Sequence, residues 1–557
     1  MEEKLKIGIL LDDHIVPSWE YKIIEDIHKS DFAGIVLIIM NKRDHRLSEK
    51  KGKQPYYTML KLLEKTDWLV FKREPDHDLK KDLSELIRNI PLVNISSGSE
   101  HSSENTSGQV IRDIASHGLD IILKFGSHIL NSDILKTANY GILTNSIDHQ
   151  KTFGGIGPGF WEVIRNSPVT SSELFLLKEK LDDYEVVFCS VESTCQYSIN
   201  VNRNNICWRT SLFMPRLLNG LHRNGQHFLS RQVSRFRSAN KKTGPYGNPY
   251  SLMNTLRDLF HYIKIAALTL HKKVFYTDAF NWQVLIEINN DDNYLAPDFR
   301  RFQKLESPKE VFWADPFVVA KDDNYFVFVE EFVYKLNKAH ISVLKLDKKG
   351  NLLSSERIIE RPYHMSYPFI FELNNIYYMI PETGKNQTIE LYRCTDFPYK
   401  WEFEKNIMEN VSAVDSTVFF YNNKWWLFTC LDQTANISGN STELFLFFSD
   451  DLFADTWESH PDNPIVSDAS TARPAGKLFI HEDKIYRPSQ NCAGRYGMGL
   501  NISQVTKLTE DEYSELLISE TEPFWDVRLK GTHTYNSDRD IKVIDVYSYR
   551  KRINFQG

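Results

Sequence analysis

The sequence predicts a multidomain protein in which an α/β domain with an open parallel sheet precedes an all-β, five-bladed propeller. Up to about residue 205, short apolar runs alternate with stretches that repeat apolar residues at helical spacing. From about residue 275, aromatic and β-branched residues alternate instead, with polar turn signals between them. A chain of 557 residues is long enough for two or three domains. We therefore expect an α/β domain at 1–205, a connector at 206–274 and the propeller at 275–550.

The first domain is predicted from runs that are rich in Ile, Val and Leu. The runs KIGILL, AGIVLIIM, LDIILKFG and GILTNS are expected strands, and WEYKIIEDIHKS and LKKDLSELIRNI are expected helices. Strands that are apolar throughout and separated by helices indicate a parallel, Rossmann-like sheet with both faces covered. In such sheets ligands bind beyond the carboxyl ends of the strands. NSIDHQ at 145–150 follows one of these ends, and the glycine-rich FGGIGPGF comes next.

The connector has a basic part and an apolar part. Residues 222–242, HRNGQHFLSRQVSRFRSANKK, are interpreted as a solvated linker. The stretch at 262–275, YIKIAALTLHKKVF, is interrupted by lysines and is shorter than the roughly 20 apolar residues that span a bilayer. We expect a buried or interfacial helix there and no integral membrane segment, while contact with a membrane surface stays open.

The propeller is predicted from a repeat of about 50 residues. Four segments align: WADPFVVAKDDNYFVFVEE, MSYPFIFELNNIYYMIPET, AVDSTVFFYNNKWWLFTC and TARPAGKLFIHEDKIYRPS. Their matched residues Asp315, Tyr367, Asp415 and Arg473 are 52, 48 and 58 residues apart. Repeated hairpins at this period are typical of a β-propeller. The fifth blade is expected to combine WQVLIEIN near 282 with the C-terminal IKVIDVYSY and so to close the ring.

Composition excludes some functions. The net charge of −7 and the pI near 6.2 disfavour a nucleic-acid binder, which needs a basic face. The six cysteines form no CxxC pair, so neither a zinc site nor a disulfide framework is predicted, and no metal is expected. Reduced thiols and an N-terminus without signal-peptide character favour a cytoplasmic protein.

The N-terminal segment resembles the catalytic domain of the formyltransferase family, which includes methionyl-tRNA and sugar N-formyltransferases. The resemblance is carried by LDIILKFGSHILNSDILKTANYGILTNSIDH, GGIGPGFWEVIRN and LDDYEVVF. It implies 10-formyltetrahydrofolate as a cofactor, Asn145 as a stabiliser of the oxyanion and Asp182 as a residue that orients or accepts a proton. Ile147 occupies the place of the family's histidine. His149, two residues further on, is the candidate replacement, although a shift of this size moves the side chain by several ångströms.

The C-terminal half resembles the propeller that precedes the transferase domain of plant glucosamine inositolphosphorylceramide transferases. WADPF, SYPFIF, YYMIPET, DSTVFFYNNKWWLF, ARPAG and YRPSQNCAGRYG carry this resemblance. More distantly it resembles arabinanase-type glycosidases, which use a base Asp, an auxiliary Asp and an acid Glu. Asp315 and Asp415 match the two aspartates. Arg473 stands at the place of the acid, where it suits a phosphate or carboxylate, and Glu382 is a substitute acid, with Glu330 and Glu331 as further candidates.

Equivalent blade starts converge on the central channel of a propeller. Asp315, Tyr367, Asp415 and Arg473 are therefore expected in one funnel, and Arg487 is added by the same reasoning. We interpret the chain as a transferase-like protein of surface-glycan biosynthesis that recognises a nucleotide-linked or phosphorylated sugar, with formyl or acyl transfer to an amino sugar as one hypothesis. A non-catalytic glycan-binding scaffold and a glycosidase or glycosyl-transferring propeller are the alternatives. The aromatic pairs Tyr377–Tyr378 and Trp425–Trp426 are predicted to lie in the blade core.

Overall fold

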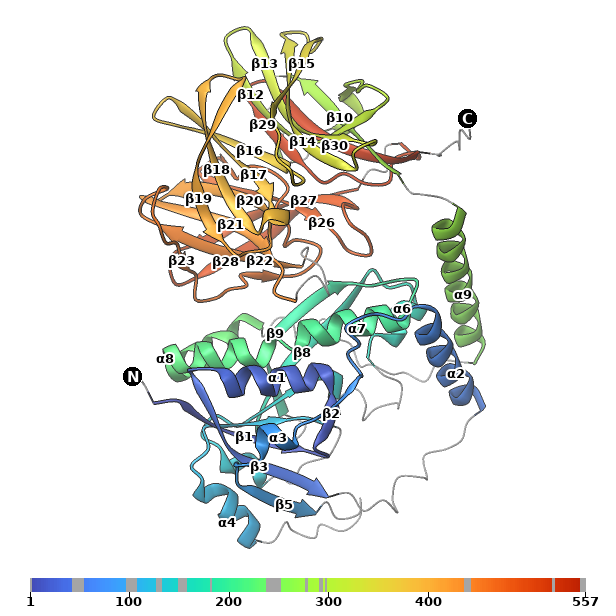
Figure 1. The fold of residues 1–557 in the computed structure, drawn as a ribbon, viewed down its shortest axis with the longest axis vertical. Coiled ribbons are helices and arrows are strands. Elements are labelled where there is room, and N and C mark those ends of the chain that lie inside the picture. Colours follow the sequence, from blue (N-terminus) through green and yellow to red (C-terminus); the bar gives the residue numbers. More distant parts are fainter. Residues whose placement is uncertain are drawn as a thin grey trace. The chain divides into compact units, whose positions relative to one another are not determined.

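The protein was analysed as a computed structural model, in which the chain divides into two compact units, Met1–Ala266 and Ala267–Gly557. The structure describes residues 3–42, 55–96, 108–126, 133–148, 158–180, 183–236, 252–275, 279–289, 294–295, 298–434, 442–522 and 526–550. Figure 1 shows the described elements, with labels on most of them.

The first unit contains a seven-stranded sheet. Its strands, in spatial order, are β5 (Leu92–Ser96), β3 (Ala33–Lys42), β1 (Leu5–Leu11), β6 (Ile121–Lys124), β7 (Ile142–Asn145), β8 (Val169–Lys180) and β9 (Asp183–Ser193). The first five are parallel, and β8 and β9 form an antiparallel hairpin at one edge. A short pair, β2 (Ile15–Pro17) with β4 (Lys80–Asp82), lies outside this sheet. The predicted parallel sheet is thus confirmed.

Helices cover both faces of this sheet because its strands are apolar on both sides. Ile7 and Ile9 of β1 belong to a core with α1 (Ser18–Lys29) and α8 (Phe213–Phe236), whereas Leu10 joins a core on the other face with α4 (Gly108–Ser116) and the turn η2 (Ile134–Thr137). Side chains that alternate along one strand therefore point to opposite faces of the sheet and belong to two different cores. The other helices are α2 (Pro55–Val70), α3 (Ser84–Ile87), α6 (Phe160–Ile164), α7 (Ile199–Thr210) and α9 (Leu252–Phe275).

Two expectations for this half differ from the structure. The basic segment predicted to be a solvated linker contributes most of α8, which buries Leu221, Phe228 and Leu229 in the main core of the first unit. The reason is its apolar stripe, which the high charge of the segment conceals. LKKDLSELIRNI forms β4 and the short α3 rather than one long helix. Among the described residues, no helix is long and apolar enough to cross a membrane.

The second unit is a propeller of five sheets. Four of them are consecutive: β12 (Val311–Lys321) to β15 (Leu352–Ile359), β16 (Ser366–Leu373) to β19 (Lys400–Glu409), β20 (Ala413–Tyr421) to β23 (Glu458–Ser459), and β25 (Phe479–His481) to β28 (Tyr513–Thr521). Their middle strands are β13 (Asn324–Val333), β14 (Lys338–Asp347), β17 (Ile376–Thr383), β18 (Thr388–Asp396), β21 (Lys424–Leu431), β22 (Glu443–Ser449), β26 (Lys484–Asn491) and β27 (Gly499–Leu508). The short β24 (Val466–Ser467) pairs with β22, and the turns η4 (Phe299–Arg301) and η5 (Gly384–Asn386) lie between strands.

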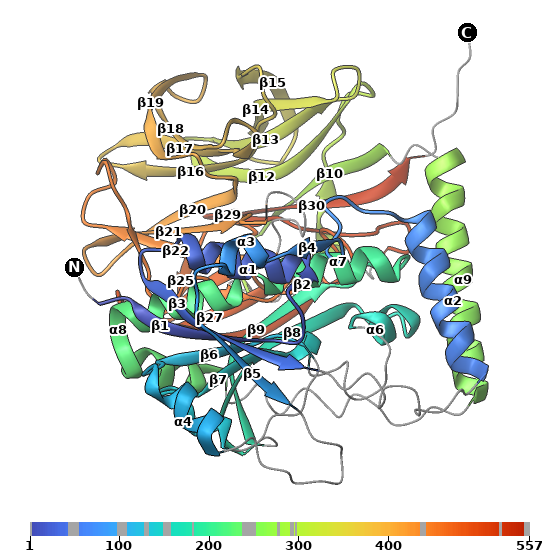
Figure 2. The same cartoon turned by 60° about the horizontal axis from the view of Figure 1, so that its bottom comes forward.

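The fifth sheet closes the ring. It orders β11 (Gln303–Lys304), β10 (Ala279–Ile288), β30 (Ile541–Arg550) and β29 (Tyr535–Asp538). β10 pairs with β30 over their whole lengths, from Ala279 opposite Arg550 to Ile288 opposite Ile541. Figure 2 shows these two strands together although they come from opposite ends of the propeller sequence. The predicted closure of a five-bladed ring is confirmed.

Candidate functional site

Three blades begin with the same backbone irregularity. At Asp315, Tyr367 and Asp415 the φ angles are 49°, 44° and 52°, a left-handed conformation that residues other than glycine rarely adopt. At each position the pairing of the two inner strands shifts register. A β-bulge of this kind re-aims a side chain, and its strain is retained most often at functional positions. The backbone N–H of Tyr367 donates to Asp315 Oδ2 at 3.1 Å, which links two of the bulges directly. We use the name mouth for the end of the propeller's central channel at which these three bulges lie.

Asp315 lies in a buried cluster of charges at the mouth. Thr534 Oγ1 donates to Asp315 Oδ1 at 2.9 Å, and His533 Nε2 lies 3.6 Å from the same oxygen. On the other side of the imidazole, His533 Nδ1 lies 2.7 Å from Asp545 Oδ2. Asp545 also accepts hydrogen bonds from the backbone N–H groups of Asp315, His533 and Thr534. The imidazole is therefore held between two carboxylates.

Arg473 forms the second part of the mouth. Its Nε donates to Asp415 Oδ2 at 2.5 Å, and its Nη2 lies 3.6 Å from Glu382 Oε2. Gln490 Nε2 donates to the same oxygen of Asp415 at 2.8 Å. The ring of Tyr496 covers the guanidinium, with 4.8 Å between the ring centroid and Cζ. Asp415, Glu382 and Arg473, predicted from separate blades, are thus in mutual contact.

Burial and charge determine the protonation of these groups. Burial raises the pKa of Asp315 to about 7, although the neighbouring His533 opposes this shift. Burial and the nearby Asp415 carboxylate raise the pKa of Glu382 well above its ordinary value. Burial alone would lower the pKa of His533, but Asp545 and Asp315 raise it to about 9. Near neutral pH the mouth therefore holds an imidazolium, and the environment of Glu382 favours its carboxylic acid form, which donates as well as accepts hydrogen bonds.

Asp315, His533 and Asp545 also offer ligand atoms that lie within 4.8 Å of one another, as a metal site would require. Hydrogen bonds and ion pairs inside the cluster already use both oxygens of Asp545 and both ring nitrogens of His533. We interpret the three residues as an ion-pair network. The absence of a metal stays a prediction.

The structure separates the two arginines that were predicted together. Arg487 is 1% exposed and does not face the mouth residues; its Nε and Nη2 donate to the two carboxylate oxygens of Glu515 at 2.8 and 2.7 Å. A further hydrogen bond runs to the carbonyl of Thr471. Because its donors are engaged inside the fourth of the consecutive sheets, the geometry favours a structural role for Arg487. Arg473 is paired with the Asp415 carboxylate, which leaves little positive charge for a phosphate.

Tyr367 closes the channel below the mouth. Its ring is fully buried, and its hydroxyl lies 3.0 Å from Thr417 Oγ1 and accepts from the backbone N–H of Gly476 at 2.9 Å. These contacts join three blades across the channel axis. The Tyr367 side chain therefore blocks the channel. Because it is fully buried, we expect a ligand at the mouth to contact the neighbouring residues instead.

Sequence reasoning missed several residues of the mouth. His533 and Thr534 precede the innermost strand of the closing blade, so GTHTY was the available signal for a fifth blade start. Tyr496 is 41% exposed in a loop that has no repeat signal. The two further acid candidates lie in different surroundings. Glu330 lies 3.3 Å from His364, which borders the Asp315 cluster. Glu331 instead accepts a hydrogen bond from Trp313 Nε1 and pairs with His340.

In the first unit only part of the predicted site is described. Asn145 is fully buried at the end of β7, where its side-chain amide donates to Asp148 Oδ2 at 3.0 Å and its Oδ1 accepts from the backbone N–H of Asp148. Ile147 is 2% exposed and packs into the main core. His149 and Asp182 lie outside the described residues. Their predicted roles stay predictions.

Residues 303–551 match a family model described as "Glucosamine inositolphosphorylceramide transferase 1, N-terminal". The propeller is similar to this family. The match covers less than half of the chain and excludes the first unit. Two relatives named glucosamine inositolphosphorylceramide transferase 1 are 36% identical over 211 residues (Oryza sativa subsp. japonica) and 30% identical over 232 residues (Arabidopsis thaliana). These alignments cover 37% and 41% of this chain, and they span only 28% and 29% of the relatives' lengths.

Solved structures with a related outline are glycoside hydrolases. The catalytic domain of a Coprinopsis cinerea GH62 α-L-arabinofuranosidase is 12% identical with a TM-score of 0.34, and covers 49% of this chain and 97% of its own. A Cellvibrio cellulosa α-L-arabinanase is 16% identical with a TM-score of 0.32, over 43% of this chain and 90% of its own.

Proposed function

We propose that this protein takes part in glycosyl transfer to a phosphoinositol-bearing lipid, and that the mouth of its propeller recognises a sugar of the donor or acceptor. The relatives' name supports the reaction class. The site itself supports sugar recognition: the exposed Tyr496 ring lies on Arg473, which contacts Glu382, and beside His533 of the Asp315 cluster. An aromatic face combined with groups that both donate and accept hydrogen bonds suits a ring with many hydroxyls.

The single observation that carries the proposal is the placement of Tyr496 on Arg473. The guanidinium is paired with the Asp415 carboxylate and lies 3.6 Å from Glu382, so it serves to hold the tyrosine ring and the two carboxyl groups in place. This arrangement leaves an aromatic surface open to solvent beside the buried carboxyl groups of the mouth. A nucleotide-linked sugar is the proposed donor form.

Replacing Tyr496 with alanine is expected to weaken sugar binding about tenfold, equivalent to about 1.4 kcal/mol, because the stacking surface is removed. Binding to the full chain is measured by saturation-transfer NMR and calorimetry with a panel of nucleotide-linked amino sugars and free sugars. Tyr334→Ala, on a half-buried tyrosine of the propeller, is the control. The proposal is overturned if no member of the panel binds, or if both variants bind the sugar as the natural chain does.

Glu382 also allows a test of chemistry against binding. Glu382→Gln keeps the size and the hydrogen-bonding groups but removes the transferable proton. If the propeller only recognises the sugar, this variant retains binding and sugar transfer. If Glu382 acts as a general acid, as in the glycosidase alternative, the variant retains binding and loses turnover.

For the first unit, we propose formyl or acyl transfer from 10-formyltetrahydrofolate as a second activity. It is supported by Asn145, which ends a parallel strand at the sheet edge where ligands bind in such folds. Calorimetric titration with a folate analogue is expected to show binding that Asn145→Ala abolishes while the thermal unfolding of the chain stays cooperative. Failure of the unaltered chain to bind the analogue would refute this second proposal and leave the first untouched.

A further inference from the structure

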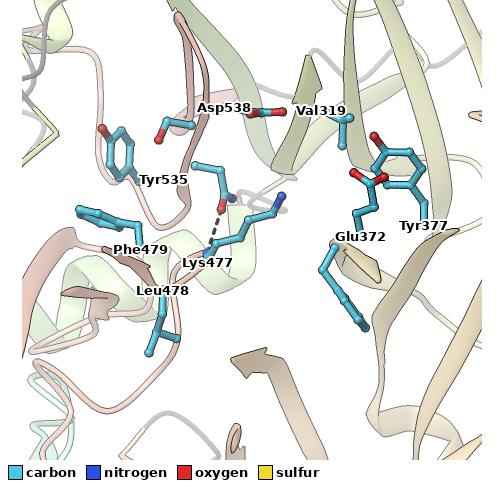
Figure 3. Close-up of a pocket in the computed structure, with 11 residues that line it drawn as sticks. Val319, Glu372, Tyr377, Lys477, Leu478, Phe479, Tyr535 and Asp538 are labelled. Carbon is cyan, nitrogen blue, oxygen red and sulfur yellow. Dashed lines mark hydrogen bonds between the residues drawn. The ribbon is translucent and has the colours of Figure 1, made fainter. Parts of the chain in front are cut away.

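The propeller has a pocket of about 300 Å³ at the end of the channel opposite the mouth. Figure 3 shows the side chains around it, with Lys477 between two walls. Glu372 and Tyr377 form one wall, and Tyr535 and Asp538 belong to the other; Phe479 lies beside them. Tyr377, predicted to be blade core, is in fact a half-buried pocket residue.

The position of the pocket follows from the geometry of the innermost strands. Val319 and Phe371 line it, and each lies four residues beyond a mouth residue, Asp315 and Tyr367 respectively. At about 3.3 Å per residue, four residues span roughly 13 Å. The Tyr367 hydroxyl and its partners Thr417 and Gly476 lie between the two ends. The pocket is thus a separate site.

The backbone around Lys477 is fixed, so its side chain is presented to the pocket. Gly476 has a φ of +143°, and a Cβ there would lie 2.1 Å from the carbonyl oxygen of Tyr535. The backbone N–H of Lys477 donates to Asn536 Oδ1 at 2.9 Å. Within the described part of the chain, no hydrogen bond or salt bridge engages the Lys477 ammonium. Burial lowers the pKa of Lys477 to about 8, although Asp538 opposes this shift.

The walls of the pocket offer hydrogen-bond acceptors and aromatic rings, in contrast to the ammonium of Lys477. The carboxylates of Glu372 and Asp538 face the pocket as hydrogen-bond acceptors, and Asp538 Oδ2 is anchored by the backbone N–H of Ala320 at 2.8 Å. The rings of Phe479 and Tyr535 offer apolar surface. Hydroxyl groups of a ring would donate to the carboxylates, the ring face would pack on the aromatic side chains, and the ammonium would remain for an anionic substituent.

We propose that this pocket is a second carbohydrate site, which binds one pyranose- or inositol-sized ring that carries a carboxylate or a phosphate. The volume is at the lower end of the range for small-molecule sites, which suits a single ring. An uncharged ring supplies no counter-charge for the Lys477 ammonium. An anion without hydroxyls adds no donor for the remaining acceptor capacity of Glu372, which is exposed and hydrogen-bonded to Tyr377, or of Asp538, which accepts from Ala320. A ring that carries both hydroxyls and an anionic group offers a partner to all three charged side chains.

The test is calorimetric titration of the full chain at pH 7 with glucuronate, glucose 1-phosphate, myo-inositol 1-phosphate, glucose and inorganic phosphate. At least one of the three anionic rings is expected to bind at least ten times more tightly than glucose and than inorganic phosphate. Whether glucuronate or a ring phosphate binds best shows which anionic group the site prefers. Lys477→Met is expected to abolish this preference, and Lys348→Met, on an exposed lysine, is the control. Equal binding of glucose or of inorganic phosphate would overturn the proposal, as would an unchanged preference in Lys477→Met.

Two further measurements separate this site from the mouth and from a folding defect. Tyr496→Ala is expected to leave the affinity for the anionic ring unchanged; its loss would assign the binding to the mouth and refute the second site. Affinity is expected to fall as the pH rises from 7 to 9, because the ammonium loses its proton while it faces Glu372, Asp538 and Tyr377. Lys477→Arg is expected to bind the anion with no such fall, whereas a pH-independent affinity of the unaltered chain would count against the role of Lys477.

Discussion

Replacing Arg487 with methionine is expected to destabilise the propeller by about 3–5 kcal/mol. The substitution leaves the Glu515 carboxylate without its cation inside a sheet, where Arg487 is 1% exposed and forms two hydrogen bonds to that carboxylate. The carbonyl of Thr471 loses a donor as well. Because no ligand contact is involved, sugar binding measured well below the unfolding temperature should not change.

Urea unfolding followed by tryptophan fluorescence measures this effect. The matched variant is Arg487→Met combined with Glu515→Leu, which removes both charges and is expected to recover most of the lost stability. A loss below about 1 kcal/mol in the single variant would show that Glu515 is solvated, contrary to the structure. A loss of sugar binding without a loss of stability would return Arg487 to the functional role first predicted for it.

The propeller is expected to lose on the order of 2 kcal/mol of stability between pH 7 and pH 9.5 through His533. The pKa of His533 is raised from 6.5 to about 9 in the folded chain, so the folded state binds more protons than the unfolded state in this window. The stabilisation is fully present below pH 6.5 and is lost as the pH rises through 9. Asp315, with its pKa raised to about 7, contributes a decline in the same direction at lower pH.

Thermal unfolding at a series of pH values tests this expectation. His533→Gln removes the imidazolium between Asp315 and Asp545, so its unfolding temperature should be lower at pH 7 and should vary less with pH. His481→Gln, on a histidine whose ring contacts are with Tyr294 and Tyr486, should keep the slope of the unaltered chain. An unaltered slope in His533→Gln would mean that the imidazole is neutral in the folded protein.

Much of the mouth could be predicted from the sequence because the propeller repeats. Asp315, Tyr367 and Asp415 occupy equivalent places in successive hairpins, and equivalence along the chain becomes convergence in space once the sheets are arranged around an axis. Arg473 followed from the same period. Glu382 was chosen as a candidate acid from its strand end; the structure places it 3.6 Å from Arg473, and its role as an acid stays a prediction.

The remaining mouth residues could not be predicted from the sequence, because no repeat or motif surrounds them. Tyr496 acts from an irregular loop, and Asp545 lies on β30 among apolar residues typical of a buried strand. Arg487 shows the converse: its sequence context resembles that of Arg473, yet Glu515 captures it inside a blade. Contacts between residues far apart in the chain decided each of these roles.

The sequence by itself determined the parallel sheet, the five blades and the closure of the ring, because these depend on hydrophobic periodicity and on a repeat that can be read along the chain. Only the tertiary structure decided the pKa shifts of Asp315, Glu382 and His533 and the pairing of Arg473. It also decided the presentation of Lys477 in a pocket. These properties depend on burial and on charges brought together from different blades, and neither is encoded in the spacing of residues along the chain.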